Sequence, residues 1–459
     1  MSNYNFTKEP KKIDKVNTKN ISIKTKLPAK GTKEFFLDLQ KYESRSMHGQ
    51  IPIIWKKASN FNIYDIANNK FIDFTSGIFI SNIGHSNQKL LKNLKNLLNS
   101  EILSCYSYLN SQRKEYIKNL IKFTGLKGYK AYLVSSGTEA TEAALKIMRM
   151  KGKKFNKNYI LAYEGNWHGR TLGAQMMSGN PAQKDWIKNL DNEIIHLPFP
   201  YPWEVSEKDS HNFFVENLNF LKKEKINFEK IAGVMLETFQ GWCSAFYPKN
   251  YVKLIRDFTK KYDITMTFDE MQAGFARTGK NFGYQHYGIK PDLICVGKGM
   301  GGGVPLSGLI GRADLLDLPG VGSMSSTHSA NPLVCSAGLS VLKEIQTRKL
   351  VKKTFDKGLI IKNKLNKLMS EFPSYIKGVY GKGMIHAIIF NTENLKKGKK
   401  NTSYIVSQIC ENIMFRGLLV VHTGRESIKI GPPLTISKNA LDEGLSIIVD
   451  EITETIKGI

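Results

Sequence analysis

The chain has 459 residues, of which 41% are hydrophobic and 10% aromatic. This composition is typical of a soluble globular enzyme, and the length allows two domains. The formal net charge is +27, from 67 basic and 40 acidic residues. The basic residues are mostly lysines spread along the chain, without the arginine-rich stripe or interleaved aromatic residues of nucleic-acid-binding modules. We therefore expect neither nucleic acid nor a membrane as a partner, although the charge can attract anionic substrates.

The cysteines and the N-terminal segment indicate in which cellular compartment the protein is expected. The five cysteines are Cys105, Cys243, Cys295, Cys335 and Cys410. Their number is odd and their spacing is not that of a metal site or redox motif, so we expect reduced thiols, no metal and a cytoplasmic protein. The N-terminus has no apolar signal core, and no stretch is long enough to span a bilayer. Residues 1–33 are polar and lysine-rich, and we expect them to form a flexible arm or a strap on a partner subunit.

The first elements in chain order are short. An amphipathic stretch at residues 35–42 precedes short predicted strands at 51–55, 62–65 and 70–73, with a hairpin turn at Asn68-Asn69. A glycine-punctuated segment, residues 77–85, then leads into a predicted helix over residues 88–98. Tyr106 and Tyr108 follow, and the sequence leaves open whether they line a cleft or pack in the core.

A strand that turns into a helix follows at residues 131–150. The apolar run at 131–134 passes through Ser135, Ser136 and Gly137 into good helix formers from Thr138 onward. A helix N-terminus offers unpaired N–H groups and the positive end of the helix dipole, so this turn can bind an anion. An ordinary helix cap is the alternative, because serine and threonine are preferred there.

Polar residues also end the next predicted strands. The strand at 159–163 leads to Trp167 and His168 in a loop, where a flat aromatic side chain can stack on a planar ring or simply be half buried. The strand at 231–236 ends at Glu237, and an amphipathic helix at 248–262 follows it. This strand–helix–strand order predicts parallel βαβ units.

The most informative stretch joins an acid and a lysine. The strand at 264–268 ends at Asp269, and the short apolar run at 293–296, typical of a strand buried on both faces, is followed by Lys298. Both side chains then stand at strand carboxyl ends, where open α/β sheets bind ligands. Pyridoxal phosphate (PLP) chemistry needs such a pair: the lysine holds the aldehyde as a Schiff base and the acid pairs with the pyridinium nitrogen. Taken singly, Asp269 could be a cap or loop acid and Lys298 one lysine among many.

The remaining elements complete the predicted domains. Residues 305–311 form a predicted strand, residues 323–332 a hydroxyl-rich loop, and Pro332 begins a helix. Lysine-rich helical stretches then flank short strands at 384–390 and 418–421. We expect residues 34–75 with 337–459 to form a small α+β domain, and residues 76–336 a large α/β domain.

With these motifs, the chain from about residue 35 to 455 resembles the class III (subgroup II) aminotransferases of PLP fold type I. The resemblance implies an aspartate aminotransferase-like fold, in which a large domain with a mostly parallel seven-stranded sheet joins a smaller α+β domain from both chain ends. The residues that match the family's cofactor motifs are Ser136, Gly137, Thr138, Trp167, His168, Glu237, Gln240, Gly241, Asp269, Gln272, Lys298 and Thr327.

The family resemblance also implies roles. Lys298 and Asp269 would be the catalytic residues, Trp167 would stack on the pyridine ring, and Gln272 would contact the ring hydroxyl. Ser136 to Thr138 would form the phosphate turn. Thr327 would reach the phosphate of the other subunit, which implies a homodimer with shared active sites.

The chain departs from the family pattern at three positions, and the departures at Trp242 and Lys429 concern the substrate. Thr238 replaces a proline, and Trp242 stands where many members have a second glutamate. Lys429 occupies the place of an arginine that grips a substrate carboxylate, three residues before Pro432-Pro433-Leu434. Arg425 and His422 lie just upstream, and we expect Arg425, then Lys429, then His422 as carboxylate ligands. An arginine side chain can grip both oxygens of a carboxylate.

The sequence thus predicts an aminotransferase that moves an amino group from an amino acid or ω-amino compound to a 2-oxo acid by a ping-pong mechanism. An aminomutase, epimerase or decarboxylase of the same family remains an alternative, because the cofactor motifs do not separate these reactions. A basic nucleic-acid-binding protein on an inactive enzyme scaffold would be expected to lack Lys298 or Asp269, and both are present.

Overall fold

The computed structural model describes residues 4–459, and the chain divides into two compact units. Unit 1 contains the residues up to Asn87 together with Lys353–Ile459, and unit 2 contains Gln88–Lys352. The sequence predicts residues 76–87 in the large domain and residues 337–352 in the small domain. In the structure they belong to unit 1 and unit 2, respectively. Hydrogen bonds explain the first difference, since residues 76–82 bond to Gly431 and Leu434 of unit 1. The second follows from helix packing, because the helix that begins at Pro332 packs on two helices of unit 2.

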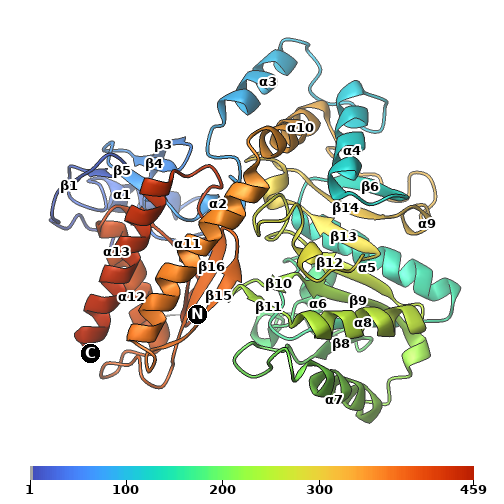
Figure 1. The fold of residues 1–459 in the computed structure, drawn as a ribbon. Helices are drawn as coiled ribbons and strands as arrows, with labels where there is room; N and C mark the ends of the chain where they lie inside the picture. The colour runs from blue at the N-terminus through green and yellow to red at the C-terminus, as the bar shows by residue number, and fades with distance from the viewer. Residues whose placement is uncertain (1–3) are drawn as a thin grey trace. The chain divides into compact units, whose positions relative to one another are not determined.

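Unit 2 is built on a seven-stranded sheet (Figure 1). All neighbouring strands are parallel except for the two pairs that include β14. The order is β6 (Tyr129–Val134), β14 (Ser307–Arg312), β13 (Leu293–Val296), β12 (Thr265–Asp269), β9 (Ile231–Glu237), β7 (Tyr159–Tyr163) and β8 (Ile194–Leu197). The predicted mostly parallel seven-stranded sheet is confirmed.

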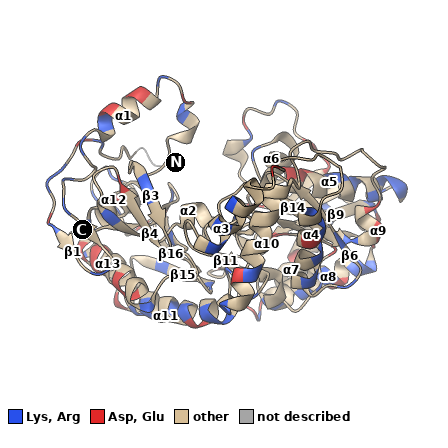
Figure 2. Ribbon diagram, turned by 90° about the horizontal axis from the view of Figure 1, so that it is seen from above, with Lys and Arg blue, Asp and Glu red and all other residues tan. Residues whose placement is uncertain are grey.

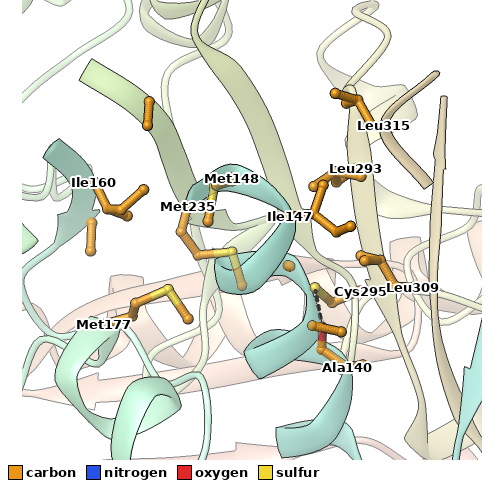
Figure 3. Packing of buried hydrophobic residues seen from close by; sticks show 14 of the residues in the cluster. Ala140, Ile147, Met148, Ile160, Met177, Met235, Leu293, Cys295, Leu309 and Leu315 are labelled. Atoms are coloured by element: carbon orange, nitrogen blue, oxygen red, sulfur yellow. Dashed lines mark hydrogen bonds between the residues drawn. The ribbon is translucent and has the colours of Figure 1, made fainter. Parts of the chain in front are cut away.

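The core of unit 2 lies between this sheet and α5 (Gly137–Lys154), which contacts five of its strands. Small and apolar residues of the helix, among them Ala140, Ile147 and Met148, pack on buried strand residues (Figure 3). The Cys295 thiol lies 3.6 Å from the carbonyl oxygen of Ala140. This packing fixes the N-terminus of α5 against the strands that carry the acids and the lysine.

Further helices and a small ribbon complete unit 2. The helix predicted at residues 88–98 is α3, and α10 begins at Pro332 as predicted, capped by the Asn331 side chain. The other elements are α4 (Ser111–Thr124), α6 (Leu172–Met177), α7 (Ser210–Lys223), α8 (Lys249–Lys261), α9 (Ala313–Leu316), α10 (Pro332–Thr347), and the short antiparallel pair β10 (Phe239–Gln240) and β11 (Ala245–Phe246).

Unit 1 contains two sheets. The first is β1 (Val16–Asn17), β2 (Ser22–Ile23), β5 (Lys70–Asp73), β4 (Asn62–Asp65) and β3 (Trp55–Ser59), with β17 (Leu418–Leu419) beside β5. The second is β15 (Ile376–Lys382), β16 (Ile385–Phe390), β19 (Ser427–Ile430) and β18 (Val421–His422). The helices are α1 (Thr32–Leu39), α2 (Ser76–Phe79), α12 (Thr402–Phe415) and α13 (Lys438–Lys457), and α11 (Leu350–Glu371) begins just before the unit boundary. The strand expected at residues 51–55 is not formed, because β3 starts only at Trp55.

The N-terminal segment differs from the expectation of a flexible arm. From residue 4 onward it packs in unit 1, where β1 pairs with β2 and β2 pairs with β5. Ile21, Ile23 and Leu27 are fully buried, and the Thr7 amide donates to the carboxylate of Glu411 at 2.6 Å. The few apolar residues of this segment lie among many lysines, which hides their packing role in the sequence.

Basic residues are distributed over many elements of both units and alternate with acidic ones (Figure 2). This pattern agrees with charge on a solvated surface. Within residues 4–459, no helix combines the length and the apolar character needed to cross a membrane.

Candidate active site

Two acids stand side by side where neighbouring strands of unit 2 end. Strands β9 and β12 are parallel, and their register places Asp269 opposite Glu237. Both side chains are buried. Strand β13 lies on the other side of β12, and Lys298 follows its last residue by two positions. The structure thus brings the predicted acid and lysine to the same edge of the sheet, as expected for parallel strands.

The carboxylate of Asp269 is held in one orientation. Its Oδ1 accepts the backbone N–H of Met271 at 3.0 Å, and its Oδ2 is hydrogen-bonded to Nδ1 of His168 at 2.9 Å. The backbone of His168 is itself held, since its N–H donates to Ser178 and its carbonyl accepts from Thr141, both at 2.8 Å. The other ring nitrogen, Nε2, is buried and has no hydrogen-bond partner among the residues that the structure describes. His168 therefore acts on Asp269 as an orienting group.

Glu237 ties the Trp167 loop to the strand edge. Its Oε2 accepts the backbone N–H groups of Trp167 and Gly241, each at 3.1 Å. Burial raises the pKa of Glu237 to about 7, although the nearby His168 acts in the opposite direction. A Cβ on Gly241 would lie 2.5 Å from the Gln272 amide nitrogen and 2.8 Å from Oε1 of Glu237, so a side chain there would displace both groups. Glu237 and Gln272 therefore approach the same glycine closely.

Lys298 sits in a constrained turn. Its φ of +46° lies in the left-handed region, and it begins a short 3-10 helix that ends at Met300. A Cβ on the preceding Gly297 would lie 2.5 Å from the Ser307 hydroxyl oxygen and 2.6 Å from the Met271 sulfur, so a side chain there would displace these neighbours. Burial lowers the pKa of Lys298, and the negative charges of Asp269 and Glu237 oppose this shift. A lowered pKa increases the fraction of neutral amine, which is the nucleophilic and basic form.

The N-terminus of α5 lies at the turn where the sequence predicts an anion site. Ser136 caps the helix in a capping box with Glu139, whose carboxylate accepts the Ser136 N–H at 2.7 Å and its hydroxyl at 3.0 Å. The Thr138 hydroxyl is paired with that of Thr171 at 2.6 Å. Because the serine and threonine hydroxyls are engaged in this way, the first-turn N–H groups from Gly137 onward and the helix dipole are the groups best suited to an anion.

Trp167 has a cationic neighbour that the sequence reasoning did not use. The guanidinium of Arg170 lies 4.4 Å from the centroid of the half-buried Trp167 ring. Arginine stacks well on aromatic faces, so this contact fixes the plane of the indole. Arg170 was visible as part of the Trp167–Thr171 motif, and its spacing of three residues from the tryptophan was the available signal.

The departure at Thr238 has a structural reason. Its backbone N–H donates to the carbonyl of Asp269 at 3.2 Å, a bond that proline could not make. Its hydroxyl donates to the buried Glu270, which also accepts the N–H groups of Gly283 and Tyr284 at 2.7 and 2.6 Å. Burial raises the pKa of Glu270 to about 7. Sequence reasoning missed this role of Glu270, although its position next to Asp269 pointed to the site.

Trp242 replaces a charge with an aromatic group. Its indole N–H donates to Oε1 of Gln240 at 2.7 Å, and the Gln240 amide donates to the carbonyl of Glu164 at 2.7 Å. The Trp242 ring lies 6.1 Å from that of Tyr201 and 6.2 Å from that of Trp203, both edge-on. Trp242, which stands where many family members have a second glutamate, is thus part of an aromatic cluster in unit 2.

The three candidate carboxylate ligands of unit 1 differ in their surroundings. Lys429 on β19 is buried, with its ammonium 4.7 Å above the ring of Phe79. Arg425 is partly exposed and lies 3.4 Å from the neighbouring Glu426. His422 is hydrogen-bonded to the Ser407 hydroxyl at 2.9 Å and packs edge-on against Phe6, and burial lowers its pKa. A neutral, bonded imidazole is the least suited of the three to bind a carboxylate.

Thr327 lies in the loop between α9 and α10 of unit 2, and its side chain is exposed. Within this loop, the hydroxyl of Ser329 donates to that of Ser326 at 2.7 Å. The expected contact of Thr327 with a partner's phosphate stays a prediction.

Comparison with known proteins identifies the family. The sequence profile described as aminotransferase class-III matches residues 44–452. The chain belongs to the class III aminotransferase family. It is therefore a PLP-dependent enzyme of fold type I.

Relatives of this class III enzyme have several activities. This chain is 31% identical over 406 residues to a probable 4-aminobutyrate aminotransferase of Bacillus subtilis. The matched region covers 85% of this chain and 91% of that protein. The chain is 28% identical over 418 residues to a leucine/methionine racemase of Thermococcus litoralis, covering 89% and 92%. Among solved structures, the ornithine aminotransferase of Toxoplasma gondii, described with PLP at its active site, has a TM-score of 0.81 at 20% identity, over 94% of this chain and 96% of that one.

The described residues of this class III enzyme fit PLP. Asp269 offers a buried, oriented carboxylate for a ring nitrogen, and Lys298 offers an amine with a lowered pKa. The N-terminus of α5 offers N–H groups for a phosphate, and Gly297 leaves no side chain to obstruct the lysine turn. According to the roles that the family resemblance implies, Trp167 and Gln272 would contact the cofactor ring.

Proposed function

We propose that this enzyme transfers an amino group from an amino acid or ω-amino compound to a 2-oxo acid in two half-reactions, with ping-pong kinetics. The observation that supports this best is the oriented Asp269 carboxylate beside Lys298 at one sheet edge. When bound, PLP supplies an electrophilic aldehyde and an electron-withdrawing ring that stabilises negative charge on the substrate carbon.

Lys298 is the proposed base and acid. Its amine would take a proton from the substrate carbon and deliver it to the cofactor carbon that carried the aldehyde, and its lowered pKa keeps part of the amine neutral for this task. Asp269 would accept the N–H of the cofactor ring and would keep that nitrogen protonated. Because its carboxylate is fixed by Met271 and His168, little reorganisation accompanies the reaction.

Lys429 and Arg425 are the proposed ligands of the substrate carboxylate. A carboxylate in a partly buried site needs a cation, because an unpaired buried charge is costly. Lys429 supplies a buried point charge, and Arg425 a fork that can bond both oxygens.

Racemisation is the second candidate reaction, and the similarity to a leucine/methionine racemase favours keeping it. A racemase returns the proton to the opposite face of the same carbon, and it releases no oxo acid. A screen of amino donors against pyruvate and 2-oxoglutarate, with chiral analysis of the recovered donor, separates the two. Amino transfer with retained chirality supports the proposal, whereas inversion without an oxo-acid product supports the racemase.

The role of Lys298 can be tested directly. After borohydride reduction of the purified enzyme, we expect mass spectrometry to find the cofactor on the peptide that contains Lys298. The exposed Lys290 provides a control, and its alanine variant should carry the cofactor at Lys298 as the wild type does. Modification of another lysine in the wild type would show that the assignment is wrong.

We infer a homodimer with shared active sites. Tyr108 and Leu109 of unit 2 are 77% and 95% exposed, which is unusual for large apolar side chains. Near them a hollow of about 340 Å³ is lined by residues that include Tyr106, Tyr132 and Met324. A second copy would cover these surfaces, and Thr327 would then serve the other copy's phosphate site. Mixing Lys298→Ala chains with Thr327→Val chains should restore partial activity in hybrid dimers, and a fully active monomer in sedimentation would contradict this.

A cytoplasmic location is part of the proposal. All five cysteines are free thiols, and four of them are buried. Reduced thiols agree with a reducing compartment. Fractionation of the cells that make the enzyme would test this.

A further inference from the structure

Residues 76–79 of unit 1 form a left-handed turn. The φ angles of Ser76, Gly77, Ile78 and Phe79 are +50°, +60°, +63° and +68°. Only one of the four is glycine, and Ile78 is β-branched. A left-handed conformation is sterically unfavourable for every residue except glycine, so such a run persists only where surrounding contacts determine it.

A buried polar network joins the residues that flank this turn on both sides. Asp73 accepts the N–H and the hydroxyl of Thr75 at 2.7 and 2.6 Å, and the Thr75 hydroxyl accepts the N–H of Gly77 at 3.0 Å. The other oxygen of Asp73 bonds Nε2 of His85 at 2.6 Å, and Nδ1 of His85 pairs with the Ser81 hydroxyl at 3.1 Å. The acid, the imidazole and both hydroxyls thus form one chain of hydrogen bonds.

Three hydrogen bonds connect the turn and its flanks to the end of β19. The Ser76 hydroxyl donates to the carbonyl of Gly431 at 2.6 Å, and the Gly431 N–H donates to the carbonyl of Phe74 at 2.7 Å. The N–H of Leu434 donates to the carbonyl of Asn82 at 3.0 Å. The turn is therefore bonded to the segment that begins at Gly431, directly after β19, the strand that carries Lys429.

The turn presents the ring of Phe79 to that segment. A Cβ on Gly431 would lie 2.4 Å from the Phe79 ring, so the ring packs directly on the glycine backbone. The ammonium of Lys429 lies 4.7 Å from the ring centroid. A cation over an aromatic face is attracted by the ring, by about 2 kcal/mol where the pair is desolvated.

We propose that the left-handed turn is a positioning device, in which Phe79 holds the Lys429 ammonium at the place where the substrate carboxylate binds. This inference rests on the proposed role of Lys429. An arginine fork is pre-organised, whereas a lysine ammonium sits on a flexible four-carbon stem. The Phe79 ring restricts that stem, and thereby replaces the rigidity lost where this chain has lysine instead of arginine. Phe79 is thus a positioning residue, and the strain of the turn serves to place its ring.

The central test compares Phe79→Leu with Phe79→Tyr in the holoenzyme. Leucine keeps an apolar side chain without the aromatic face, and tyrosine keeps the face. We expect Phe79→Leu to raise KM for the 2-oxo acid about 5- to 30-fold with kcat within twofold, as a lost cation–π contact implies. Phe79→Tyr should stay within threefold of the wild type. An unchanged KM in Phe79→Leu would overturn the inference.

Binding of glutarate, a dicarboxylate without a reactive carbonyl, gives a readout that is independent of turnover. Calorimetry on the holoenzyme should show the same 5- to 30-fold weaker Kd in Phe79→Leu. In a Lys429→Met background, replacing Phe79 should change Kd by less than twofold, because the two side chains then no longer interact. Additive losses in the double variant would contradict a coupled pair.

The design separates the two proposals. If Lys429→Met leaves Kd and KM unchanged, the carboxylate assignment itself fails. If Lys429→Met weakens binding and Phe79→Leu does not, only the positioning inference fails. Should Phe79→Leu not fold, Gly431→Ala provides the second variant, because its methyl group displaces the ring, and the same rise in Kd is expected.

Discussion

The acids of unit 2 and the cations of unit 1 are held in different ways. Asp269 and Glu237 accept backbone N–H groups at the ends of paired strands, so the sheet itself fixes them. Lys429 rests on an aromatic ring, and Arg425 lies in a loop after a glycine. Strand-end geometry is rigid and suits a cofactor that is the same throughout a family. Side-chain packing is easier to vary, which agrees with the departure from the family pattern at Lys429.

The largest effect is expected for Lys298→Ala. Without the amine, no side chain at this position can move the proton, and acid–base catalysis alone contributes about 10²–10⁴-fold. We expect at least a thousandfold loss in single-turnover reaction with an amino donor. Lys290→Ala is the control and should keep full activity. Turnover near the wild-type rate in Lys298→Ala would contradict the central role given to unit 2.

Asp269→Asn should cost about a hundredfold or more in kcat, because a neutral amide cannot keep a ring nitrogen protonated. The amide can still accept the Met271 N–H, so folding and cofactor content should persist. Thermal melting and absorbance of the bound cofactor provide the controls. A kcat near that of the wild type would exclude this role.

Arg425→Ala tests the loop cation of unit 1. We expect KM for the 2-oxo acid to rise by the equivalent of about 1.5–3 kcal/mol, the usual worth of a hydrogen bond to a charged group. Cofactor absorbance should not change. Arg416→Ala is a matched control, since its guanidinium contacts Asp450 of α13. If neither Arg425→Ala nor Lys429→Met alters KM for any carboxylate substrate, the carboxylate binds elsewhere.

The elements that carry the candidate cofactor residues could be predicted from the sequence, because strands that are buried on both faces have unbroken runs of apolar residues. Strand β13 is one example, with all four residues buried. The left-handed turn could not be predicted, since Ser76, Ile78 and Phe79 carry no local signal for positive φ. Its conformation depends on Gly431, far away in the sequence. The N-terminal packing was hidden for the same reason, because Glu411 is its distant partner.

The pH dependence of stability provides a test within unit 2. Burial raises the pKa of Glu237 from 4.5 to about 7, so between these values the folded state binds more protons than the unfolded state. Stability therefore falls as pH rises from about 4.5 to 7, and the penalty is complete above the folded pKa. Glu237→Gln carries no such penalty, and its free energy of unfolding relative to the wild type should increase by about 1–3 kcal/mol from pH 5 to pH 8. The exposed Glu216→Gln is the control, and a pH-independent difference would contradict the buried acid.

The smallest effect is expected where the N-terminal segment touches the candidate substrate residues of unit 1. The Phe6 ring lies 4.9 Å from that of His422, edge-on, and Tyr4 bonds Glu411 through its hydroxyl. An aromatic pair of this kind contributes about 0.5–1.5 kcal/mol. Phe6→Ala should therefore speed hydrogen exchange at the amides of residues 421–425 by about 2- to 10-fold, with KM for the 2-oxo acid raised by less than the same factor.

Tyr4→Phe is the matched control for that experiment, because it removes only the hydroxyl that bonds Glu411 and keeps the aromatic ring, which packs on Tyr404. Exchange at residues 421–425 should then change by less than twofold. If Phe6→Ala leaves exchange there unchanged, the segment packs on unit 1 without supporting the loop of Arg425. If it raises KM as much as Arg425→Ala does, packing matters as much as charge in unit 1. Side-chain packing would then position both Lys429 and Arg425 in unit 1, whereas backbone N–H groups hold the acids of unit 2.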